Sequence, residues 1–177
     1  MRKSCIPNVF TFINLSCGVI SILSVMDEKY AMAGIFILLA GLVDRYDGRI
    51  ARFLDVSSDL GKELDSLADL VSFGVAPSIL VYIFFNLESF GPNGLLGFAV
   101  LLLFPICGAY RLARFNTAEF DGSFTGVPIT IVGCFMALFS LIVIQLKLDV
   151  TMLIYISVLL MIIGSYLMVS TLKLKKV

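Results

Sequence analysis

Residues 44–69 read DRYDGRIARFLDVSSDLGKELDSLAD, a polar stretch between two apolar runs at 30–43 and 70–85. These runs hold 14 and 16 residues, whereas a helix needs about 20 to cross the hydrocarbon core of a bilayer. The simplest interpretation is that both helices continue from the membrane into the polar stretch. We therefore expect a helical hairpin whose charged ends project into the membrane interface.

Four more apolar runs flank this hairpin, at 9–26, 94–110, 127–146 and 150–169. The chain is 59% hydrophobic and 15% charged, whereas soluble domains are about 45–50% apolar and 25% charged. Its mean hydropathy is +1.02. The sequence predicts an all-α, polytopic integral membrane protein with six transmembrane helices, formed by a single domain over residues 1–177.

The positive charges are distributed asymmetrically along this topology. With the N-terminus inside and six crossings, eleven of the 13 Lys and Arg residues fall on the inner side, and only Lys29 and Lys147 fall outside. Cytoplasmic loops of membrane proteins carry such an excess. We therefore expect a multi-pass protein of the cell membrane, with both termini and the 44–69 stretch facing the cytoplasm.

The chain contains no His, which excludes a Ser-His-Asp triad and a His-ligated zinc site. A general base must then be a carboxylate, Lys, Tyr or Cys. None of the four Cys residues belongs to a Cys-x-x-Cys pair, so we interpret them as small apolar side chains. Net charge is zero and by itself says nothing about partners. We expect no nucleic-acid partner.

Four carboxylates in the hairpin have helical spacing. Asp44 and Asp47 lie three apart, and Asp65 and Asp69 lie four apart on the next helix, so each pair shares one face. Acids beside lipid are costly, and they repel one another unless a cation lies between them. Ligand sets made of oxygen alone suit Mg²⁺, Mn²⁺ or Ca²⁺. Two such ions could clamp a phosphoryl group.

The alternative is a solvated loop in which these acids pair with nearby Lys and Arg side chains. It explains the mixed charge, but it does not explain the helical spacing. It also leaves unexplained the small residues on or beside the carboxylate face, Gly48, Ala51 and Gly61.

The pattern Asp44-x-x-Asp47-Gly48-x-x-Ala51-Arg52, followed after eight residues by Gly61-x-x-x-Asp65-x-x-x-Asp69, resembles the signature of the CDP-alcohol phosphotransferase family. Every fixed position matches. The resemblance implies that the first three Asp residues bind metal, and that Asp69 both binds metal and acts as general base. The metal would be Mg²⁺ or Mn²⁺, with Ca²⁺ as an inhibitory substitute. A homodimer is also implied.

The same resemblance implies a set of contacts to the CDP-lipid substrate. The matching positions are Asn8, Thr11, Gly48, Ala51, Arg52, Ser58 and Gly61. For Asn8 and Thr11, helix N-terminal capping is the alternative.

The acceptor is indicated by the stretches RLARFN at 111–116 and FTGVP at 124–128, which resemble the phosphatidylserine synthase branch of the family. An amino-acid acceptor needs a cation for its carboxylate, which Arg111 and Arg114 would supply. Glu119 or Asp121 would meet its ammonium group. The alternative for the two Arg residues is contact with lipid headgroups. The resemblance implies transfer of the phosphatidyl group of CDP-diacylglycerol to L-serine.

Other functions stay open on the sequence. Glycerol phosphate or inositol phosphate as acceptor would also require Arg residues. A membrane ion transporter would also carry acids within its spans, but near the midplane and on several helices, rather than gathered at one end. A structural membrane protein would not need four regularly spaced Asp residues.

Overall fold

The computed structural model describes residues 5–54, 59–117, 124–171 and 173–174. Within these ranges, the backbone alone is described for 5–7, 47–54, 59, 124–125 and 173–174. The fold is helical, as predicted. Two short strands, β1 (Phe124–Thr125) and β2 (Lys173–Leu174), pair antiparallel near the C-terminus, and the sequence did not predict them.

The helices follow the six apolar runs. In chain order they are α1 (Cys5–Met26), α2 (Tyr30–Leu54), α3 (Asp59–Asp69) with η1 (Leu70–Val75) and α4 (Ala76–Phe84), α5 (Leu95–Thr117), α6 (Ile129–Gln145) and α7 (Val150–Val169). Two short 3₁₀ turns, η2 (Leu87–Ser89) and η3 (Pro92–Gly94), connect α4 to α5. The prediction that the two short runs extend into the polar stretch is confirmed, because α2 continues to Leu54 and the next helix begins at Asp59.

Among the described residues, four helical segments are long and apolar enough to cross a membrane: Asn8–Met26, Leu60–Phe84, Pro92–Thr117 and Val150–Val169. Helix α6 is apolar but has only 17 residues, and α2 has 25 residues with the charged stretch at its end. Large apolar side chains are exposed on all the long helices, for example Leu23, Leu42, Ile106, Phe135 and Ile163. A soluble monomer rarely exposes apolar surface so widely, so the prediction of a membrane protein is confirmed.

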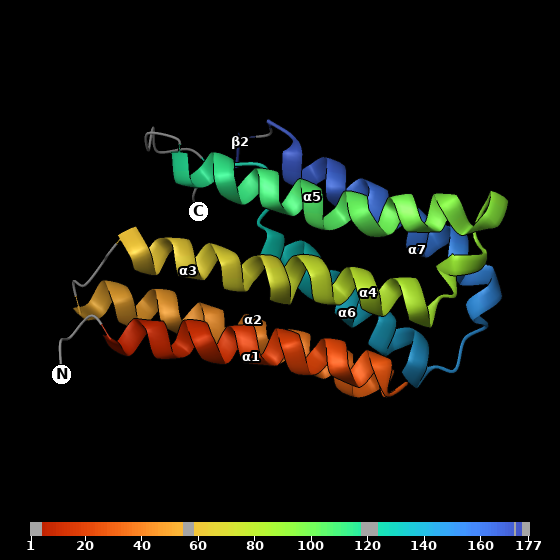
Figure 1. Cartoon of the computed structure of the whole chain (residues 1–177), viewed down its shortest axis with the longest axis horizontal. Helices are drawn as coiled ribbons and strands as arrows, with labels where there is room; N and C mark the ends of the chain where they lie inside the picture. The colour runs from red at the N-terminus through yellow and green to blue at the C-terminus, as the bar shows by residue number, and fades with distance from the viewer. Residues whose placement is uncertain (1–4, 55–58, 118–123, 172, 175–177) are drawn as a thin grey trace.

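The helices pack in pairs around a continuous central segment. In Figure 1, α3 and α4 form one line through η1, with the α1–α2 pair on one side and the α5–α7 pair on the other. Helix α6 packs against α2 and α4. The buried core includes Ile37, Phe73, Phe85 and Phe104. This arrangement places the hairpin ends of α2 and α3 together at one end of the bundle.

The central segment changes its helical geometry directly after Asp69. From Leu70 to Val75 it is a π-helix, in which the Ala76 N–H donates to the Val71 carbonyl oxygen. Pro77 follows at the start of α4 and has no N–H to give an α-helical bond. Segments of π-helix are rare and frequently lie at functional sites. The sequence did not predict this one.

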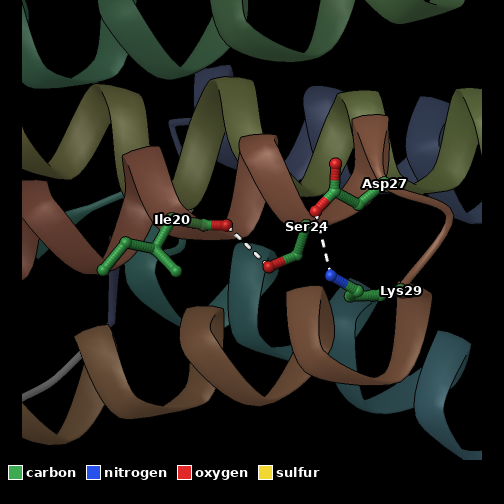
Figure 2. A network of polar contacts seen from close by, with 4 residues as sticks. All are labelled: Ile20, Ser24, Asp27 and Lys29. Carbon is green, nitrogen blue, oxygen red and sulfur yellow. Dashed lines mark hydrogen bonds and ion pairs between the residues drawn. The ribbon is translucent and has the colours of Figure 1, made fainter.

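The opposite end of the bundle holds a tight turn between α1 and α2 (Figure 2). Glu28 adopts a left-handed conformation with φ of 60°, and the Lys29 N–H donates to the Ser24 carbonyl oxygen at 2.8 Å. Lys29 also forms an exposed ion pair with Asp27 at 3.0 Å, which contributes little to stability. A cavity of about 670 Å³, lined in part by Lys29, Tyr30 and Phe84, lies at this end, away from the acidic hairpin.

Candidate metal and catalytic site

Three of the four predicted carboxylates meet in the structure. Asp44 comes from α2, and Asp65 and Asp69 come from α3. One oxygen atom of each carboxylate lies within 4.8 Å of the others. Asp44 and Asp65 are partly exposed, whereas Asp69 is only 8% exposed. The side chain of Asp47 is not described, although its backbone lies on α2 one turn beyond Asp44.

Local sequence explains why two of the three carboxylates lie together. Asp65 and Asp69 are four apart on α3, so their side chains lie one above the other on the same face. Asp44 approaches them because α2 and α3 are the arms of a hairpin. Three carboxylates this close repel one another, and their oxygen atoms are the ligands that Mg²⁺ and Mn²⁺ prefer. The donor set therefore fits a divalent cation.

Asn14 of α1 holds the buried carboxylate in place. Its side chain is 1% exposed, and its Nδ2 donates to Asp69 Oδ1 at 3.0 Å. The backbone carbonyl oxygen of Asn14 accepts a hydrogen bond from Ser72 Oγ at 2.9 Å. Gly18 allows this close approach, since a Cβ there would lie 2.5 Å from Ser72 Oγ. Helix α1 is thus fixed against the segment that carries Asp69.

Sequence reasoning did not single out Asn14. The available signal was a polar amide inside the apolar run 9–26, because intramembrane polar side chains usually face the bundle interior and mark function.

Arg111 of α5 follows the carboxylates in the sequence, whereas Asn14 precedes them. The Arg111 guanidinium interacts electrostatically with Asp69. Its guanidinium lies 5.7 Å from the centre of the Phe115 ring. Its buried Nε has no hydrogen-bond partner among the described residues. Arg111 was predicted to bind the acceptor, and this contact stays a prediction; its charge interacts with the predicted general base.

Arg114 makes different contacts. Its Nη1 donates to the Val169 carbonyl oxygen at 2.9 Å, and its Nη2 donates to the Ser170 carbonyl oxygen at 3.2 Å. These carbonyl groups end α7, where a cation also interacts favourably with the helix dipole. Arg114 therefore ties α5 to the end of α7, and its predicted contact with the acceptor stays a prediction.

Asn116 links the end of α5 to α3. Its Nδ2 donates to Glu63 Oε1 at 3.2 Å and to Ser66 Oγ at 3.0 Å. Its backbone carbonyl oxygen accepts from Lys62 Nζ at 3.5 Å. These bonds hold α5 beside the helix that carries Asp65 and Asp69.

The remaining predicted positions are described only in part. Asn8 and Thr11 lie inside α1, which begins at Cys5, so neither caps the helix N-terminus and that alternative is wrong. Gly61 lies in the first turn of α3. Gly48, Ala51 and Arg52 lie on α2 where the backbone alone is described, and Ser58, Glu119 and Asp121 lie outside the described residues.

The fold and the carboxylates together define a helical membrane protein with an oxygen-ligand site suited to a divalent cation. A family model described as CDP-alcohol phosphatidyltransferase matches residues 4–173, and the chain belongs to this family. The resemblance seen in the Asp pattern is thereby confirmed.

Relatives with curated names include serine phosphatidyltransferases and an archaetidylserine synthase. The chain is 40% identical over 126 residues to a CDP-diacylglycerol–serine O-phosphatidyltransferase of Helicobacter pylori, covering 70% of this chain and 52% of that protein. It is 38% identical over 138 residues to the Bacillus subtilis protein of the same name, covering 76% and 75%. An archaetidylserine synthase of Methanothermobacter thermautotrophicus is 37% identical over 140 residues, with 77% and 58% covered. The chain spans about half the length of the Helicobacter pylori relative.

Proposed function

We propose that this chain transfers the phosphatidyl group of CDP-diacylglycerol to the hydroxyl group of L-serine, giving phosphatidylserine and CMP. The observation that carries the proposal is the convergence of Asp44, Asp65 and Asp69 within 4.8 Å at the hairpin end of a chain of this family. The choice of serine is supported by the names of the relatives.

Asp69 is the general base in this proposal. The acceptor hydroxyl group lies against its carboxylate, and the hydroxyl oxygen attacks the lipid-side phosphorus of the pyrophosphate. The proton passes to Asp69, the bond from that phosphorus to the bridging oxygen breaks, and CMP leaves. Asn14 keeps one carboxylate oxygen fixed by its hydrogen bond to Asp69 Oδ1. In the same proposal, the guanidinium of Arg111 binds the acceptor's carboxylate.

We also propose that Asp44, Asp65 and Asp69, together with Asp47, hold Mg²⁺ or Mn²⁺, with Ca²⁺ as an inhibitory substitute. Bound ions would neutralise the pyrophosphate and the charge that develops on it. The Asp cluster supports a cation site; its carboxylates keep their places through α2, α3 and the bond from Asn14.

The proposed topology keeps six crossings, with both termini and the site on the cytoplasmic face of the cell membrane. Support comes from the six helical segments and from the excess of Lys and Arg on one side. The family match over 4–173 supports a single domain over 1–177. A homodimer is proposed from the family resemblance, and the contacts to CDP-lipid from Asn8, Thr11, Gly48, Ala51, Arg52, Ser58 and Gly61 are proposed on the same basis.

The test is release of labelled CMP from CDP-diacylglycerol by the purified, Mg²⁺- or Mn²⁺-loaded protein. L-serine, glycerol phosphate and inositol phosphate are supplied in parallel, with Asp65→Asn as the inactive control. We expect release with serine alone. Release with only a phosphorylated acceptor would replace serine in the proposal, and no release with any acceptor would overturn the enzymatic function.

A further inference from the structure

Three buried side-chain polar atoms have no hydrogen-bond partner within the described part of the chain: Asn14 Oδ1, Arg111 Nε and Asn116 Oδ1. All three belong to α1 or α5 side chains that interact with α3. A buried polar atom left unpaired costs free energy, so each such atom needs an explanation. Two of the three, on Asn14 and Arg111, belong to side chains that interact with Asp69 itself.

Asp69 determines which way the Asn14 amide faces. A carboxylate only accepts hydrogen bonds, so the amide must turn its NH₂ group toward Asp69 and its oxygen elsewhere. The oxygen and nitrogen of an amide lie about 2.2 Å apart, and Nδ2 is 3.0 Å from Asp69 Oδ1. Asn14 Oδ1 therefore lies within roughly 5 Å of the proposed base, as an unpaired acceptor in a side chain that is 1% exposed.

Arg111 Nε is a hydrogen-bond donor, whereas Asn14 Oδ1 is an acceptor. It is an unpaired donor on a different helix, and the guanidinium to which it belongs interacts electrostatically with the same carboxylate. A zwitterionic amino acid complements both atoms, because its ammonium group donates and its carboxylate accepts. In a hydroxy amino acid such as serine, the hydroxyl group is on the carbon next to the one that carries both charges. A phosphorylated alcohol offers no cationic donor to Asn14.

We infer that Asn14 is a specificity-determining residue of the acceptor site. Its Nδ2 holds Asp69, and its Oδ1 accepts a hydrogen bond from the ammonium group of a zwitterionic hydroxy amino acid. The inference rests on the proposed function, since it places the acceptor hydroxyl group at Asp69. Asn14 selects acceptors by their ammonium group, whereas the Asp cluster acts on the CDP-lipid whatever the acceptor.

The experiment compares L-serine with 3-hydroxypropionate, which lacks only the ammonium group, as acceptors for CMP release from CDP-diacylglycerol. The measured quantity is the ratio of their kcat/KM values, in the wild type and in Asn14→Leu, which removes both amide atoms at similar size. We expect the wild-type ratio to fall by about ten- to a hundredfold in the variant, as for loss of a charged hydrogen bond. Asn14→Ser serves the same purpose if the larger change prevents folding.

Ser72→Ala is the matched control, because it breaks the other bond between α1 and the central segment and leaves the Asn14 amide in place. It should leave the ratio unchanged even if both rates fall. An unchanged ratio in the Asn14 variants would overturn the inference. If the half-saturating Mn²⁺ concentration also rose, Asn14 would be a metal ligand instead. Absence of CMP release by the wild type with any acceptor would instead refute the proposed function.

Discussion

Replacement of Asp69 by Asn separates its proposed catalytic role from its place in the fold, since the amide has nearly the shape of the carboxylate. Asp69 is 8% exposed, and its Oδ1 accepts a hydrogen bond from Asn14 at 3.0 Å. An amide oxygen can accept the same bond, and the amide NH₂ can donate to Asp44 or Asp65. We expect Asp69→Asn to fold and bind CDP-diacylglycerol, and to lose about 10²–10⁴-fold in kcat, as for a general base.

The same substitution should stabilise the protein in the absence of metal. The three carboxylates each place an oxygen within 4.8 Å of the others. Two unit charges at that separation repel by about 3.5 kcal/mol at an effective dielectric of 20. Asp44 and Asp65 are partly exposed, so solvent screens part of this repulsion. We expect the free energy of unfolding to rise by roughly 1–3 kcal/mol.

The assay measures thermal unfolding of the detergent-purified protein in chelator, CMP release in Mn²⁺, and CDP-diacylglycerol binding. Glu63→Gln is the control, since it removes a charge from an exposed position on the same helix while keeping an acceptor oxygen for Asn116 Nδ2, and it should change stability by no more than about 0.5 kcal/mol. Undiminished CMP release by Asp69→Asn would remove Asp69 as the base. A metal-free variant less stable than the wild type would contradict the calculated repulsion.

Four further outcomes are expected. Chelation should abolish CMP release, and Mg²⁺ or Mn²⁺ should restore it and raise the unfolding temperature; activity that survives chelation would refute the cation site. Arg111→Gln should raise the KM for serine about tenfold or more, as for a lost charged hydrogen bond, with little change for CDP-diacylglycerol; an equal effect on both would argue against acceptor contact. Arg114→Ala should lower the unfolding temperature, because it removes two charge-assisted bonds to the end of α7 worth about 1.5–3 kcal/mol each. An unchanged unfolding temperature would show that these bonds do not stabilise the fold. The predicted acceptor contact additionally requires a raised KM for serine. Gly133→Ala should destabilise by about 1–3 kcal/mol, because its Cβ would lie 2.5 Å from the Phe73 carbonyl oxygen; Gly34→Ala, which meets only a flexible side chain, should cost less, and equal costs would contradict this account.

Much of the hairpin could be predicted because its determinants are local. The runs at 30–43 and 70–85 are too short to span a bilayer, so the extension of both helices followed from length alone. The spacing of Asp65 and Asp69 fixed their shared face. The π-helix after Asp69 could not be predicted, since Pro77 signals a lost hydrogen bond but not how the neighbouring turns adjust.

The sequence by itself determined the helices, their apolar character and the pairing of acids along one helix, because these depend on periodicity over a few residues. Only the tertiary structure decided that Asn14 meets Asp69 across 55 positions of chain, that Arg111 interacts electrostatically with the same carboxylate, and that Arg114 binds the end of α7. Contacts between helices depend on how whole surfaces pack, and no local period in the sequence specifies them.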